Sequence, residues 1–362
     1  MTATLLTPIF APGLRLLPGL ALCAVLAACA MVLGDLPSFQ AHGLGVLTLA
    51  IVLGMLVGNT VYPRWAGASG PGVHVAKQRL LRLGVVLYGL RLTTQDMASV
   101  GLAGVLVDAL VLGSTFALAC WVGTRWLGLD RNTAMLVGMG SAVCGAAAVM
   151  ATGPVLRARA EQVTVAVATV VVFGTLATFV YPLLYAWNLQ AQWVPGGAHG
   201  FGIYTGSTIH EVAQVVAAAR AIGPEAADAA VIAKMVRVMM LAPVLLALSA
   251  WLAREGAHTP AQAAPQPLAI PWFAVGFVGM VLFHSLQWLP VSVVAVGNQV
   301  DTVLLAMAMA ALGLSTQLGA IRRAGVRPLL LAGLLFAWLV VGGAGIQHGV
   351  AEIISAPAGI NR

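Results

Sequence analysis

Five ionisable residues lie inside apolar segments long enough to cross a membrane, and they are the first candidates for chemistry. They are Asp108, His210, Glu211, Lys234 and Arg237. A charge within the hydrocarbon region is costly, so such residues usually line a site, a proton path or a buried ion pair. Lys234 and Arg237 are three residues apart, which places them on one face of a helix. They could bind an anionic substrate, or they could pair with Asp108 or Glu211 as structural salt bridges.

Asp108 and the His210-Glu211 pair are the candidates for carrying a coupling proton. A histidine beside a carboxylate can gain and lose a proton near neutral pH. A carboxyl group buried in a membrane is a common proton carrier as well. The histidine could instead be satisfied by a neighbouring carbonyl, and Asp108 could be the counter-ion of Lys234 or Arg237.

Two segments, near 133–155 and 203–220, are rich in small residues, and each contains a glycine followed by a serine. A helix that breaks there uses glycine for the tight turn and serine for its hydroxyl group. The helix that restarts presents free N–H groups with partial positive charge, and two such starts facing each other would bind an anion. The substrate-binding residues that we predict are Gly140, Ser141, Cys144, Gly145, Gly206, Ser207, Thr208, Lys234 and Arg237.

Signals for enzymatic chemistry are weak, and we expect neither an enzyme nor a cofactor. The run from His210 to Gln214 approaches the HExxH pattern of zinc proteases, but Gln214 replaces the second metal ligand. The four cysteines lack CxxC spacing, so a zinc site and disulfides are not expected. The chain contains no phosphate-binding GxxxxGKS loop, no GxSxG turn and no dinucleotide fingerprint. ATP-driven transport by this chain is therefore not expected.

Composition excludes a soluble domain. Of 362 residues, 60% are hydrophobic and 8% are charged, whereas soluble domains carry about 25% charged residues. The apolar runs have about the 20 residues that a helix needs to cross a bilayer. The formal net charge is +7, and most cations lie between apolar runs, where they orient the chain rather than bind nucleic acid. The composition predicts an all-α polytopic membrane protein.

The spacing of apolar runs and cations predicts a topology of about nine full spans. They lie near 14–33, 44–61, 79–93, 99–122, 161–187, 228–252, 271–289, 300–318 and 328–349. Cationic loops mark the cytoplasmic side, which places the N-terminus in the cytoplasm and the C-terminus in the periplasm. Each small-residue segment then has both ends on one side, so we expect two re-entrant or broken hairpins that enter from opposite faces. Arg220 is an exception, a cation on the expected outer side.

Internal repeats favour the same architecture. The segment 92–95 recurs as 314–317, and the segment 140–149 recurs as 206–215. In the expected topology the copies run in opposite directions and in a permuted order, which predicts an inverted repeat. Close helix packing through small residues is the alternative explanation. We therefore expect a single transporter domain over 1–362, with an extra span at 14–33, halves at 44–187 and 203–349, and a flexible cytoplasmic connection at 254–270.

Several motifs closely resemble one family. They are Leu87-Tyr88-Gly89-Leu90-Arg91-Leu92-Thr93, the run 143–151, the run 206–218 and Lys234-Met235-Val236-Arg237-Val238-Met239-Met240. These residues resemble the YeiH-type family of sulfate exporters, and the likeness extends from about Pro18 to the last span. The resemblance implies a bacterial inner-membrane protein and makes sulfate the leading substrate. It carries over no binding residues.

Inverted repeats with interrupted helices are typical of secondary transporters. The sequence therefore predicts a secondary transporter for a small inorganic or organic anion, with proton or sodium coupling. Sulfate efflux would be one such activity, and a homo-oligomer would be compatible with it. Two alternatives stay open. One is a cation/proton antiporter in which Asp108 and Glu211 bind the cation, and the other is a membrane sensor or partner subunit that transports nothing.

Overall fold

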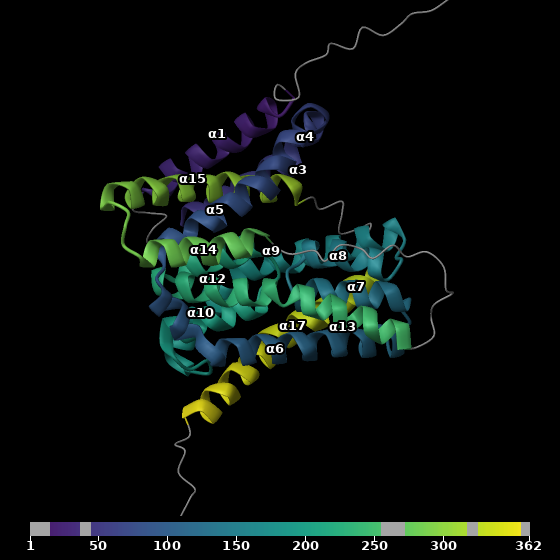
Figure 1. Ribbon diagram of the computed structural model, residues 1–362. Coiled ribbons are helices and arrows are strands. Elements are labelled where there is room, and N and C mark those ends of the chain that lie inside the picture. Colours follow the sequence, from purple (N-terminus) through teal and green to yellow (C-terminus); the bar gives the residue numbers. More distant parts are fainter. Residues whose placement is uncertain (1–14, 37–44, 255–271, 317–324, 356–362) are drawn as a thin grey trace, which may run out of the picture. The chain divides into compact units, whose positions relative to one another are not determined.

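The computed structural model describes residues 15–36, 45–254, 272–316 and 325–355, which form helices and no strand (Figure 1). Six helices are long and apolar enough to cross a membrane. They are Leu17–Gly34, Thr94–Arg125, Ala160–Ala191, Pro224–Leu252, Val291–Ser315 and Val326–Ile353. The described chain is that of an all-helical polytopic membrane protein. The connection expected at 254–270 lies almost wholly outside the described residues.

Nine full spans are not confirmed, because three of the expected spans are shorter helices. These are α3 (Val46–Thr60), α5 (Leu81–Tyr88) and α14 (Trp272–Ser285), with 15, 8 and 14 residues. A further helix, α4 (Ala66–Val75), lies between the expected spans 44–61 and 79–93, where Arg64, Lys77 and Arg79 predict a cytoplasmic loop. It continues through a π-helical turn, Ala76–Leu80, into α5. Of its three glycines, which would weaken an isolated helix, Gly72 serves close packing.

The described helices belong to two compact units. The first unit comprises 1–85 and 296–317 and holds α1 (Leu17–Gly34), α3, α4 and most of α15 (Val291–Ser315). Glycines bring its helices into close contact: a Cβ on Gly19 of α1 would lie 2.7 Å from the Cα of Gly72 on α4. Such spacing, without intervening side chains, is the usual way in which membrane helices gain packing energy.

The second unit comprises 86–295 and 318–362 and holds all the candidate site residues. Its helices besides α14 are α6 (Thr94–Arg125), α7 (Arg131–Ala142), α8 (Ala146–Val155), α9 (Ala160–Ala191), α10 (Gly197–Thr208), α11 (Val212–Ile222), α12 (Pro224–Met239), α13 (Leu241–Arg254) and α17 (Val326–Ser355). Helix α12 packs against α6, α10 and α11, while α7 packs against α6, α9 and α17. Both short-helix pairs, α7–α8 and α10–α11, pack against α9, and α10–α11 also packs against α12.

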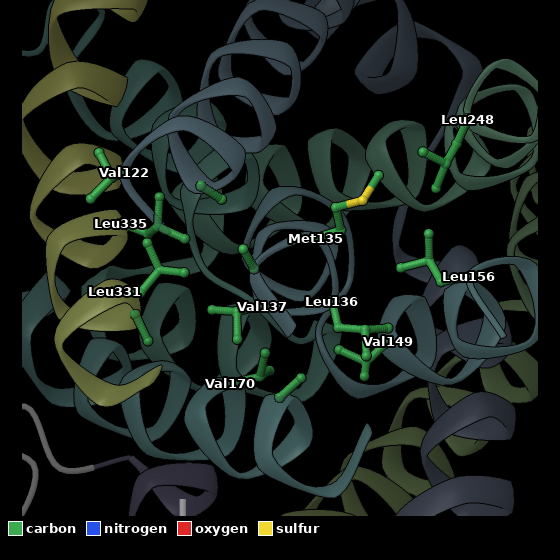
Figure 2. Packing of buried hydrophobic residues seen from close by; sticks show 14 of the residues in the cluster. Val122, Met135, Leu136, Val137, Val149, Leu156, Val170, Leu248, Leu331 and Leu335 are labelled. Atoms are coloured by element: carbon green, nitrogen blue, oxygen red, sulfur yellow. The ribbon is translucent and has the colours of Figure 1, made fainter. Parts of the chain in front are cut away.

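An apolar core holds the α7–α8 pair in place. Met135, Leu136 and Val137 of α7 are buried, together with Val149 of α8 and Leu331 of α17, and Figure 2 shows their side chains converging. The start of α7 is also fixed, because Asp130 accepts a hydrogen bond from the Thr133 backbone N–H at 3.3 Å. The α7–α8 pair is therefore held by this core and by the cap at the start of α7.

Candidate functional site

The first small-residue segment breaks between α7 and α8, as the sequence predicts. Helix α7 ends at Ala142, and Val143 has φ −119° and ψ −88°. Gly145 has φ +72° and ψ −135° and precedes the first residue of α8. Such a positive φ favours glycine, because a Cβ would be strained there. The chain thus leaves the helix for three residues and then restarts.

The second small-residue segment breaks in a similar way between α10 and α11. Helix α10 ends at Thr208, and Ile209 is extended, with φ −76° and ψ 147°. Glu211 is also extended, with φ −106° and ψ 148°, and directly precedes α11. Neither segment is therefore an unbroken helix.

The structure corrects the expected position of the Gly-Ser residues within these breaks. Gly140 and Ser141 lie in the last turn of α7, and the corresponding residues Gly206, Ser207 and Thr208 lie in the last turn of α10. They stand at the carbonyl ends of helices, which carry partial negative charge, and not at helix starts. The glycine and the serine keep helical conformation because the breaks come later, at 143–145 and 209–211.

Close packing explains the two glycines better than a turn does. A Cβ on Gly206 would lie 2.9 Å from the Cβ of Ala233 and would collide with the Ala230 carbonyl oxygen on α12. A Cβ on Gly140 would lie 2.6 Å from a methyl group of Val170. This is the small-residue packing that the sequence leaves as its alternative.

The two buried cations bind backbone carbonyls at both breaks. The Lys234 ammonium donates hydrogen bonds to Val143 O at 2.8 Å and to Ile209 O at 2.6 Å. Both it and Arg237 are fully buried on α12. Cations at helix C-termini are favoured by the helix dipole, and the free carbonyls there need donors. Lys234 therefore joins the two breaks directly.

Arg237 completes this arrangement at the end of α7. Its Nε donates to Ala142 O at 2.7 Å, and its Nη2 donates to Ser141 O at 3.2 Å. In the described part of the chain, neither cation forms an ion pair with Asp108 or Glu211. The salt bridges that the sequence offers as an alternative are not formed, although Arg237 and Lys234 are near enough to Asp108 to act on its charge.

Glu211 links the breaks through an opposite charge. The backbone N–H of Ala146, the first residue of α8, donates to Glu211 Oε1 at 3.3 Å. The Glu211 N–H in turn donates to Gln214 Oε1 at 3.1 Å. A Cβ on Gly145 would collide with Glu211 Cγ and lie 3.2 Å from Glu211 Oε1. The start of α8 therefore binds the carboxylate of the residue that caps α11.

A set of buried polar groups around these breaks has no hydrogen-bond partner. Asp108 of α6 is fully buried, and neither carboxylate oxygen is bonded, although it lies beside Ser207, Arg237 and Lys234. The other unpartnered groups are Ser141 Oγ, Ser207 Oγ, both ring nitrogens of His210, Gln214 Nε2 and Arg237 Nη1. Buried polar groups are nearly always paired. Such a cluster is suited to bind a proton, water or a polar ligand.

Comparison with known proteins places this arrangement in a family. Residues 18–332 match the family model described as conserved hypothetical protein 698. The chain belongs to this family. It is 62% identical over 331 residues to the UPF0324 membrane protein PA5383 of Pseudomonas aeruginosa, covering 91% of this chain and 93% of that protein. It is 52% identical over 324 residues to the UPF0324 inner membrane protein YeiH of Escherichia coli K12, covering 89% and 90%. No solved structure matches.

Membership of the conserved hypothetical protein 698 family confirms the resemblance to YeiH-type proteins. The relative from Escherichia coli is named an inner membrane protein, and the described chain has six helices long enough to cross a membrane. The protein is accordingly a multi-pass inner-membrane protein. The printed names of these relatives specify no substrate.

Some functional features escape sequence reasoning. Gln214 appears in the sequence only as a missing zinc ligand, yet it binds the Glu211 backbone, and its place three residues after Glu211 was a signal for this capping. Arg220, unexpected on the outer side, lies 5.0 Å from the ring of Tyr88, whose hydroxyl donates to Asp228 Oδ1 at 2.9 Å. Cys144 is buried in the first break.

Proposed function

We propose that this protein is a secondary transporter for a small anion, working by alternating access around the two helix breaks. The observation that carries the proposal is Lys234, one buried cation hydrogen-bonded to both breaks. Movement of α7–α8 against α10–α11 would require these bonds to be exchanged. Broken helices that meet around buried charge are typical of the sites of secondary transporters.

The unpartnered donors favour an anion as the substrate. Ser141 and Ser207 hydroxyls, Gln214 Nε2 and Arg237 Nη1 are buried and can all donate hydrogen bonds. The Arg237 guanidinium keeps its charge in proteins and suits oxyanions. Sulfate is the leading substrate because of the resemblance to YeiH-type proteins. The donor set itself fits any small oxyanion.

Asp108 is the group that we assign to coupling. A proton on its carboxyl group would remove a negative charge beside Arg237, so an anion would then bind more tightly. By linkage, a bound anion would favour that proton to the same extent. Anion and proton would therefore bind together, with His210 and Glu211 as further groups that could respond.

The proposal includes the finer architecture that the sequence predicts. The α7–α8 and α10–α11 pairs would enter from opposite faces as parts of an inverted repeat with halves at 44–187 and 203–349. In such a scaffold, one half can rock against the other and expose the site to each side in turn. No chemical conversion of the substrate is involved, so the protein would not be an enzyme.

A flux assay tests the proposal. Purified protein in liposomes is loaded with labelled sulfate or another small oxyanion, and efflux is measured with and without a proton gradient. We expect efflux above that of protein-free liposomes, with a dependence on the gradient. Efflux equal to that of protein-free liposomes for every anion in the panel would exclude the proposal.

A cation/proton antiporter is the second candidate, because the oxygens of Asp108 are buried acceptors without partners. In cation transporters the carbonyls at helix breaks often coordinate the ion. Here Lys234 and Arg237 already occupy such carbonyls, which favours the anion transporter. Cation-dependent proton flux in the same liposomes without added anion would reverse this order.

A further inference from the structure

The carboxylate of Glu211 lies where an external anion would be expected. It belongs to the residue that precedes α11, and its Oε1 accepts the N–H of Ala146 at the start of α8. The helices that begin there, α8 and α11, have 10 and 11 residues. Helix N-termini attract anions through their free N–H groups and their dipole. One carboxylate therefore neutralises the two helix starts.

The backbone around Gly145 is shaped to admit this carboxylate. Gly145 combines φ +72° with a position at which a Cβ would collide with Glu211 Cγ. Both conditions favour glycine, the first through backbone strain and the second through space. The backbone conformation of Gly145 and its missing side chain therefore leave room for a carboxylate group beside the start of α8.

Glu211 does not use all the donors beside it. Its bond to Ala146 is 3.3 Å long, whereas charge-assisted N–H···O bonds are usually about 2.7–2.9 Å. Gln214 is fully buried, and its Oε1 holds the Glu211 N–H, which leaves Nε2 at the same helix start without a partner. Both ring nitrogens of the neighbouring His210 are also buried without partners. These groups can donate hydrogen bonds to an anion that has more oxygens than the Glu211 carboxylate, or whose oxygens lie closer to the donors.

We propose that Glu211 is a built-in occupant of an anion site formed by the starts of α8 and α11, and that a small oxyanion substrate binds by displacing it. As far as the substrate is concerned, this inference rests on the proposed transport function. The site itself is independent of transport. With Glu211 in place, the empty protein keeps its helix starts neutralised, and a substrate must compete with a tethered carboxylate.

The test measures anion binding by the full-length protein in detergent. Formate, acetate and sulfate are each titrated against the parent protein, Glu211→Ala and Glu211→Gln, with thermal unfolding as the readout. Removal of the competing carboxylate should lower the apparent Kd of at least one anion by about tenfold or more, because each factor of ten corresponds to about 1.4 kcal/mol. The anion should also restore stability that Glu211→Ala has lost.

Two further variants make the test decisive. Glu211→Gln keeps the size of the side chain but loses its charge, so it should show an intermediate gain and serves if Glu211→Ala does not fold. Glu225→Gln removes an exposed carboxylate in the first turn of α12 and should behave as the parent does. Equal anion affinities in the parent and both Glu211 variants would overturn the inference.

The flux assay separates this inference from the proposed function. Tighter anion binding by the Glu211 variants without flux in any protein would support the site and reject the transporter. Flux by the parent protein, without tighter binding in the variants, would support the transporter and reject the displacement of Glu211.

Discussion

At the residue scale, Asp108 is the most unusual group in the second unit. A buried carboxylate normally has a cationic partner or several hydrogen bonds. Asp108 has neither ion pair nor hydrogen bond, although Ser207 and Arg237 are beside it. A residue that contributes so little to local bonding is well suited to bind and release a proton.

We therefore expect Asp108→Asn to change coupling and to leave folding intact. The amide cannot carry the proton, so anion efflux should lose its dependence on the proton gradient while anion exchange continues. Apparent Tm should change little, because Asp108 forms no ion pair with any described residue and asparagine keeps the volume of the side chain and an oxygen acceptor beside Ser207. Efflux with and without a gradient measures the change, and a gradient dependence equal to that of the parent would assign coupling to another group.

The Gly-Ser residues also show how far residue types can be interpreted from sequence. Their small size indicates that the chain does something unusual near 140 and 206. It does not distinguish a turn from a close helix contact, since both favour glycine. Only the neighbouring α12, which Gly206 touches, decides between them.

At the element scale, Lys234 connects the two interrupted helices by binding a carbonyl at each break. Each break leaves helix carbonyls without intrahelical partners, and one ammonium group satisfies Val143 O and Ile209 O together. The short pairs α7–α8 and α10–α11 are thereby tied to α12 and to each other. This role explains why a cation occupies the middle of an apolar helix.

Lys234→Ala should consequently destabilise the protein. Two buried carbonyls would lose their donors, at a cost of about 1–3 kcal/mol each, and apparent Tm in detergent should fall by several degrees. Lys77→Ala, at a half-buried lysine of the first unit, is the matched control and should change Tm little. Equal Tm values for Lys234→Ala and the parent would mean that the ammonium is not structural and is free to act on substrate.

At the scale of the whole molecule, apolar residues cover much of the surface that the long helices present. Leu102, Leu183 and Val341, on α6, α9 and α17, are each more than 70% exposed. Exposed apolar surface on this scale is unfavourable in water and is expected of helices that face lipid. Both this surface and the relatives named as inner membrane proteins indicate that the helices lie in a membrane.

The number of crossings determines where the two ends of the chain lie. Nine full spans, an odd number, would place the two ends on opposite sides of the membrane, and the cationic loops put the N-terminus in the cytoplasm and the C-terminus in the periplasm. Six crossings would place both ends on one side. We expect a C-terminal alkaline phosphatase fusion to be active and an N-terminal fluorescent protein fusion to fluoresce. Two ends on the same side would refute the nine-span topology and the inverted repeat that depends on it.

Local properties of the chain were sufficient for much of this description. Membrane class, helical architecture, the neighbourhood of both breaks and the five ionisable candidates, of which all but Glu211 are buried, follow from hydropathy and residue type, because these act within a few residues. The helix α4 was missed because the cations around it, Arg64, Lys77 and Arg79, predict a cytoplasmic loop. Gly72 of α4 packs on Gly19 of α1, which is distant in sequence.

The partners of the buried charges depended on the tertiary structure. Lys234 binds carbonyls 91 and 25 residues away, and Glu211 binds an amide 65 residues away. Backbone carbonyls and amides occur at almost every residue, so no side chain in the sequence marks the ones that are left free. Which of them a buried charge satisfies is decided only when the broken helices pack together.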